Sequence, residues 1–172
     1  MHYLKCTRIV RDFTGIIPEP TGTAVDDATG LGSWYVHMFT VDRRKTLIFM
    51  NERTLMSFVV YGIKKSNCSD LHPLFLHGVE QLLQSEKVPD DRILEIVRDY
   101  AGIRYAKTDN RSALGSINDR VEHYKYSIMD KGGFVHCDLY ESMYHANRIP
   151  QRKLGWRYSV EAMHEILNKE FA

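Results

Sequence analysis

Residues 34–50 of the chain, WYVHMFTVDRRKTLIFM, decide the fold class. Aromatic and β-branched residues dominate positions 34–41 and again positions 46–50, and the polar run DRRK separates the two. Two such runs joined by a short polar turn predict an antiparallel β-hairpin. A hairpin this early argues against a doubly wound parallel sheet, in which strands alternate regularly with helices.

The pattern outside the hairpin adds further strands and a set of helices. Residues 2–6 and 103–107 fit short strands, whereas residues 54–63 fit either a strand or a helix. Apolar residues at helical spacing predict a brief helical segment at 9–13 and about five longer helices, which begin near residues 70, 89, 116, 138 and 159. We therefore expect an α+β fold, with a mainly antiparallel sheet of four to five strands packed against these helices.

Length and composition are those of a globular domain. The chain has 172 residues, of which 44% are hydrophobic and 26% charged; this argues against intrinsic disorder and fits one domain over residues 1–172. Residues 15–33 carry several prolines and glycines with few large apolar side chains, so we interpret them as a surface loop excursion.

Charge and cysteine content restrict the setting. The net charge of +1 creates no global field toward a polyanion or a membrane, so electrostatic binding has to come from local patches. Three widely spaced cysteines suit a reducing compartment better than a disulfide framework. We find no signal-peptide pattern, and the longest apolar-leaning run, residues 55–63, is far shorter than the roughly 20 residues that cross a bilayer. We expect a cytoplasmic protein without a membrane partner.

The most distinctive segment is residues 108–119, TDNRSALGSIND, which follows an expected strand and opens an expected helix. Free backbone N–H groups at such a helix start can hold an anion. The candidate anion-binding residues are Arg111, Ser112, Gly115, Ser116 and Asn118. In the alternative interpretation, Ser116 and Asp119 only cap the helix and Gly115 only supplies a tight turn. The segment lacks the glycine spacing and the lysine of a phosphate-binding P-loop, which argues against a nucleoside triphosphatase.

A second segment, residues 147–158, NRIPQRKLGWRY, is basic and aromatic without an acidic residue. Cations that contact phosphates and aromatic rings that stack on bases are the parts of a non-specific nucleic-acid groove. In the alternative interpretation, Trp156 pins this loop into the core and the charges are merely solvated. If the hairpin turn lies beside this segment, the two together form one basic face. The candidate polyanion-binding residues are Arg43, Arg44, Lys45, Arg148, Arg152, Lys153, Trp156 and Arg157.

Patterns typical of metal sites and nucleophilic catalysis are weak. His72 and His77 are five residues apart, which does not stack them on one helix face, and no Cys-x-x-Cys occurs. We therefore predict neither a metal nor a cofactor. No Gly-x-Ser-x-Gly elbow surrounds a serine. Glu52 follows an apolar strand, where a carboxylate often serves an active site, but the sequence gives it no evident partner.

Four short segments together resemble a known family. Residues 4–7 (LKCT), the hairpin, residues 51–55 (NERTL) and above all residues 111–119 (RSALGSIND) are similar to an uncharacterised bacterial and phage domain family of unknown function. Its members are small single-domain proteins, often from mobile elements or phages. The similarity runs from residue 1 to the C-terminal helix. It implies a similar fold and a cytoplasmic bacterial or phage origin, and it implies no activity.

Three classes of function follow. We favour a binding domain that contacts nucleic acid or a protein partner, such as an accessory or regulatory protein of a mobile element or phage. The first alternative is a small enzyme that acts on a phosphorylated or nucleic-acid substrate at residues 111–119, with Glu52 or His123 as acid or base. The second alternative is a toxin, antitoxin or anti-defence protein.

Overall fold

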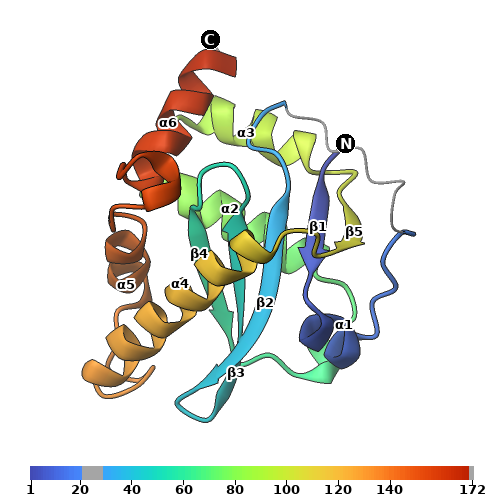
Figure 1. Cartoon of the computed structure of the whole chain (residues 1–172), viewed down its shortest axis with the longest axis vertical. Helices are drawn as coiled ribbons and strands as arrows, with labels where there is room; N and C mark the ends of the chain where they lie inside the picture. The colour runs from blue at the N-terminus through green and yellow to red at the C-terminus, as the bar shows by residue number, and fades with distance from the viewer. Residues whose placement is uncertain (21–28, 171–172) are drawn as a thin grey trace.

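A computed structural model describes residues 1–20 and 29–170 (Figure 1). Five strands form one sheet in the order β4-β3-β2-β1-β5. Their bounds are β1 (Tyr3–Cys6), β2 (Trp34–Val41), β3 (Arg44–Asn51), β4 (Ser57–Tyr61) and β5 (Arg104–Lys107). Strands β2, β3 and β4 pair antiparallel, whereas β1 pairs parallel with both β2 and β5. The expected α+β fold is confirmed, and its sheet is mixed.

The hairpin forms as its sequence predicts, with a tighter turn. Asp42 and Arg43 are the two turn residues, with φ angles of 47° and 59°, so Arg44 and Lys45 already belong to β3. Two-residue turns with positive φ at both positions match the natural twist of a hairpin. The ambiguous residues 54–63 contain strand β4, which pairs with β3 and completes a three-stranded meander.

The described residues also form six α-helices and two 3-10 turns. Their bounds are α1 (Arg8–Thr14), α2 (His72–Ser85), α3 (Asp90–Asp99), α4 (Arg111–Asp130), α5 (Leu139–Ala146), α6 (Ser159–Glu170), η1 (Lys65–Asn67) and η2 (Arg152–Leu154). One apolar core lies between the sheet and helices α2, α3 and α6, and a second lies between the opposite face and helices α4 and α5. Figure 1 shows α4 crossing the near face of the sheet, with α2 and α3 behind it.

The start of α4 differs from the sequence-based expectation. The helix begins at Arg111, and the side chain of Asn110 caps it by accepting the N–H groups of Ser112 and Ala113. The prediction that Ser116 caps this helix was wrong because Asn110, an equally good capping residue, stands one turn and a half earlier. Gly115 consequently lies inside the helix and makes no turn.

No helix within residues 1–20 and 29–170 combines the length and the apolar character needed to cross a membrane. The three cysteines carry free thiols; Cys6 and Cys68 are buried and Cys137 is half-buried.

Candidate functional site

The two segments singled out in the sequence face one another across a hollow of about 540 Å³. One wall is the first half of α4, and the other is the connection between α5 and α6. Helix α4 contributes Ser112, Gly115, Ser116 and Asp119, and the connection contributes residues 149–153 and Trp156. A hollow of this volume lies in the range of small-molecule and nucleotide-sized binding sites.

The connection is folded so that Trp156 projects outward. The N–H of Trp156 donates to the carbonyl of Gln151 at 2.9 Å, and the N–H of Gln151 donates to the carbonyl of Arg157 at 3.0 Å. Gly155 and Trp156 both have positive φ, at 65° and 66°. Trp156 is 66% exposed, so it does not pin the loop into the core. A left-handed backbone at tryptophan is uncommon and costs energy, and such strain tends to occur at functional sites.

Lys153 joins the two walls. Its Nζ donates a hydrogen bond to the backbone carbonyl of Ser112. Burial lowers the pKa of Lys153, and the negative charge of Asp119 partly opposes this. Arg152 is exposed and has no ion-pair partner within the described part of the chain. Two cations and an exposed indole therefore face the hydroxyl-bearing side of α4.

The start of α4 offers an anion fewer donors than its sequence suggests. The Asn110 side chain already occupies two first-turn N–H groups, at 2.9 Å for Ser112 and 3.3 Å for Ala113. The Ser116 hydroxyl donates to the carbonyl of Ser112 at 3.3 Å. Arg111 and Asn118 are exposed on α4 but do not line the hollow. An anion in the hollow would therefore contact side chains more than the helix terminus.

Two of the predicted cations are engaged elsewhere. Arg148 makes hydrogen bonds to both carboxylate oxygens of Glu86, at 3.0 and 2.6 Å, and stacks over the ring of Tyr144. Arg157 pairs with Glu165. These two arginines fix the position of the connection instead of facing the hollow.

The structure does not bring the hairpin turn to this site. The guanidinium of Arg44 lies 5.9 Å from the centre of the Phe134 ring, just beyond the C-terminal end of α4. The hollow lies at the N-terminal end of the same helix. A 20-residue α-helix is about 30 Å long, so Arg43, Arg44 and Lys45 lie at the opposite end of α4 from Lys153.

A second polar cluster, which the sequence did not reveal, lies just before α4. The Nζ of Lys5 is 2.8 Å from a carboxylate oxygen of Glu52 and 3.1 Å from one of Asp109. The hydroxyl of Tyr35 contacts the other oxygens of the same two carboxylates, at 3.1 and 2.8 Å. We call Lys5, Tyr35, Glu52 and Asp109 the carboxylate cluster.

Three local features assemble this cluster. Lys5 and Tyr35 are cross-strand neighbours on β1 and β2. The buried side chain of Asn51 accepts the N–H groups of Arg53 and Thr54, which holds the turn that carries Glu52. Asp109 immediately precedes the Asn110 cap. The one available signal in the sequence was a lysine inside a strand whose other residues are apolar or aromatic, since a lysine is rarely buried unless it is paired.

The cluster combines buried and accessible groups. The side chain of Lys5 is 5% exposed, that of Glu52 29% and that of Asp109 56%. Burial raises the pKa of Tyr35 far above its usual range, and the two carboxylates that accept its hydroxyl raise it further. One lysine thus faces two carboxylates, of which Asp109 is the more accessible. Glu52 thus has the carboxylate partner that its sequence context did not show.

Neither His123 nor Cys6 lines the hollow. Burial lowers the pKa of His123, which lies more than three turns into α4. Burial raises the pKa of Cys6 to about 12, so this residue is a thiol near neutral pH. Within residues 1–20 and 29–170, no three histidine, cysteine, aspartate or glutamate side chains form a group that could hold a metal ion.

Comparison with known proteins places the chain in a family. No curated protein matches it. Residues 3–162 match the family described as "Domain of unknown function (DUF6933)". This match covers nearly the whole chain and agrees with the resemblance to an uncharacterised domain family. The chain therefore belongs to the DUF6933 family.

Proposed function

We propose that the protein is a binding domain that holds single-stranded nucleic acid in the hollow between α4 and the α5–α6 connection. The observation that carries the proposal is the convergence of Arg152, Lys153 and the exposed Trp156 on one hollow. Nucleobases stack on exposed aromatic rings, and phosphates pair with cations beside them. A role as an accessory protein of a bacterial or phage mobile element is compatible with such binding.

The electrostatics favour weak, local contact over tight wrapping. The chain carries almost no net charge, and Arg148 and Arg157 already have carboxylate partners. Asp119 also lines the hollow and repels phosphate from its α4 side. We therefore expect the backbone of the nucleic acid to follow Arg152 and Lys153, with one base against Trp156.

Fluorescence anisotropy of labelled oligothymidine and oligouridine at several salt concentrations tests this proposal. Binding should weaken as salt rises, because each phosphate contact releases counterions. The double variant Arg152→Ala/Lys153→Ala should bind more weakly and reduce the slope of log K against log salt by about 1.4, or about 0.7 for each lost contact.

The matched control is Arg43→Ala/Arg44→Ala, which removes two cations at the other end of α4. It should keep the affinity and the salt slope of the unmodified protein. The proposal fails if neither oligonucleotide binds, if binding is independent of salt, or if the control weakens binding as much as the Arg152→Ala/Lys153→Ala variant does.

The carboxylate cluster favours a second candidate, an enzyme that uses acid–base chemistry on a phosphorylated or nucleic-acid substrate. Glu52 and Asp109 share one lysine and one tyrosine hydroxyl, and paired carboxylates in unlike surroundings can divide the roles of acid and base. Asp109 is three residues from Ser112, so at most about 11 Å separates their Cα atoms. Cleavage of the bound oligonucleotide, lost in Asp109→Asn but retained in Arg43→Ala/Arg44→Ala, would support this candidate. An intact oligonucleotide after prolonged incubation with and without Mg²⁺ would argue against it.

A further inference from the structure

Strand β4 forms one edge of the sheet, and a side chain already satisfies part of that edge. The N–H of Ser57 donates to Oδ1 of Asn147 at 2.8 Å, and Nδ2 of Asn147 donates to the carbonyl of Ser57 at 2.9 Å. In an antiparallel ladder, a hydrogen-bonded residue pair exchanges the same two bonds. The Asn147 amide therefore takes the place of a neighbouring strand at the first residue of β4.

Among the described residues, the rest of that edge has no neighbouring strand, although Val59 is only 5% exposed. Successive residues of a strand direct their backbone groups to opposite sides, so Val59 and Tyr61 face the same side as Ser57. Phe58 and Val60 face β3 instead. In the part of the chain that the structure describes, the N–H and carbonyl groups of Val59 and Tyr61 have no hydrogen-bond partner. Two pairs of donors and acceptors are thus spaced to match an added strand.

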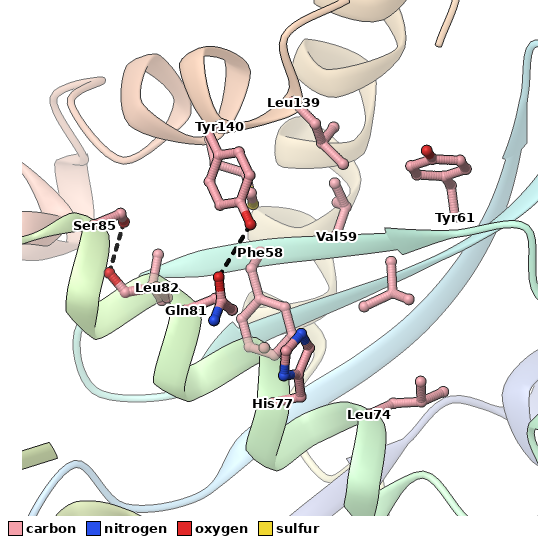
Figure 2. A pocket seen from close by; sticks show the side chains of 13 residues that line it. Phe58, Val59, Tyr61, Leu74, His77, Gln81, Leu82, Ser85, Leu139 and Tyr140 are labelled. Carbon is pink, nitrogen blue, oxygen red and sulfur yellow. Dashed lines mark hydrogen bonds between the residues drawn. The ribbon is translucent and has the colours of Figure 1, made fainter. Parts of the chain in front are cut away.

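An apolar groove of about 290 Å³ lies along this edge, between α2 and α5 (Figure 2). Leu74 and Leu82 of α2 line one side, and Leu139 and Met143 of α5 line the other. Figure 2 shows Tyr140 and Gln81 pointing toward one another across β4, where the Tyr140 hydroxyl donates to Oε1 of Gln81 at 3.1 Å. An added strand would displace this hydrogen bond and would then find apolar contacts on both of its faces.

The groove is basic at its Tyr61 end. The guanidinium of Arg44 lies 5.5 Å from the centre of the Tyr61 ring. Lys64 and Lys65 are exposed and follow β4 after a short turn. Of the hairpin cations, Arg44 therefore lies at this end of the groove. The amines of Lys45 and Lys65 lie instead over the Phe13 ring of α1, at 5.6 and 5.8 Å from its centre. An acidic group at this end of an occupant would complement the positive charge of Arg44.

We infer that β4 binds an extended segment of a partner protein, which adds a strand between α2 and α5 and places an acidic residue beside Arg44. Backbone hydrogen bonds to Val59 and Tyr61 supply register, and the groove selects apolar side chains, as in other cases of strand addition. A second copy of this chain does not fit. Paired strands lie about 4.8 Å apart, and β4 lies between two flanking helices that would collide in such a pair.

Isothermal titration with two blocked synthetic peptides tests the inference. Each peptide carries a run of valine and threonine with two aspartates at one end, and the second is the first in reverse order. At least one should bind. Two methylated forms of the bound peptide are then compared, one N-methylated at its odd-numbered amides and one at its even-numbered amides. Only one of these two sets of N–H groups faces β4, so one form should lose binding and the other should keep it. Equal binding by both methylated forms, or no binding by either parent peptide, overturns the inference.

Two variants of the protein make the test specific. Val59→Pro removes an outward N–H without breaking a ladder bond, a substitution that edge strands tolerate, and should weaken binding about tenfold or more. Arg44→Glu should lower the affinity for the peptide that ends in aspartates and raise the affinity for a version that ends in lysines. Arg152→Glu, at the far end of α4, should change neither affinity. Thermal melts confirm that each variant is folded. The inference is contradicted if Arg44→Glu leaves the preference for the aspartate peptide unchanged. It is also contradicted if sedimentation shows a dimer of the unmodified protein that becomes a monomer in Val59→Pro.

Discussion

Lys153 and Ser112, 41 residues apart in the sequence, are joined by a hydrogen bond from the lysine Nζ to the serine backbone carbonyl. This contact closes one side of the hollow and ties the α5–α6 connection to the first turn of α4. It also holds a lysine close to the exposed indole of Trp156. The proposed binding of nucleic acid depends on this arrangement. The stability of the fold depends on other contacts, which substitutions elsewhere in the chain can test.

Substitution of two helical glycines, Gly78 and Gly115, by alanine should change the free energy of unfolding in opposite directions. A Cβ on Gly78 would lie 2.0 Å from the Phe58 ring, whereas a Cβ on Gly115 would meet no atom within 4 Å. Gly78→Ala should therefore destabilise the fold by roughly 1–3 kcal/mol through overpacking. Gly115→Ala should stabilise it by up to about 1 kcal/mol, the difference in helix propensity. Urea unfolding of both variants measures the two effects, and equal effects would contradict the packing of α2 on β4.

Asn147 should be among the most sensitive polar residues of the core. Its amide satisfies the buried N–H and carbonyl of Ser57. Asn147→Ala would leave the N–H unpaired and the carbonyl with only the Tyr124 hydroxyl, at 3.4 Å. We expect a loss of roughly 1–3 kcal/mol, the penalty for one buried N–H group without a partner. Asn118→Ala, on the exposed face of α4, is the control and should shift the free energy of unfolding by no more than about 0.5 kcal/mol. Similar melting curves for the two variants would refute the role assigned to Asn147.

Removal of the buried lysine should weaken the fold more than removal of an accessible carboxylate. Lys5→Met leaves Glu52 and Asp109 close together without their shared cation, and breaking a buried ion pair costs roughly 3–5 kcal/mol. We expect a loss near the lower end, because both carboxylates retain contact with water. Asp109→Asn removes the more exposed partner and should cost less. Chemical denaturation measures the free energy of unfolding of both variants. A larger loss in Asp109→Asn than in Lys5→Met would contradict the geometry of the cluster.

Acidification should destabilise the protein through two half-buried histidines, His123 and His37. Burial lowers the pKa of His123, and the nearby positive charges of Arg120 and His145 lower it further. The unfolded chain therefore binds a proton at a higher pH than the folded protein does, so stability falls as pH drops below about 6.5. His37, whose pKa burial also lowers, acts in the same direction.

His123→Gln should reduce this loss. The comparison is the free energy of unfolding at pH 7.5 and pH 5.5, with the pH 7.5 value as each protein's own reference. An identical fall in the variant would show that His123 does not titrate in the way its burial indicates.

Local signals in the sequence were sufficient for the hairpin and for most helices. The alternation in residues 34–50 and the apolar stripes of α2 and α3 act over a few neighbouring residues, so they can be interpreted without the fold. The parallel pairing of β1 with β2 and β5 could not be predicted in this way, because β5 is about 100 residues from β1 in the sequence. The start of α4 was misplaced because two good capping residues, Asn110 and Ser116, lie close together.

The candidate sites show the same contrast between local sequence signals and long-range contacts. Residues 111–119 and 147–158 drew attention separately through their composition, but only tertiary structure brings Ser112 beside Lys153. The hairpin cations were grouped with them in a hypothesis about one basic face, and the length of α4 separates them. The carboxylate cluster joins four residues from four parts of the chain, and no local pattern connects them.

The fluorescence of Trp156 reports on the proposed stacking of a nucleobase against its indole. The chain has two tryptophans, of which Trp34 is buried and Trp156 is 66% exposed. Titration with oligothymidine at low salt should quench the emission of Trp156, and addition of salt should reverse the quenching. In Trp156→Phe the emission of Trp34 should remain unchanged while weaker binding persists in anisotropy. Equal quenching in Trp156→Phe, or bound oligonucleotide without quenching in the unmodified protein, would contradict the proposed site.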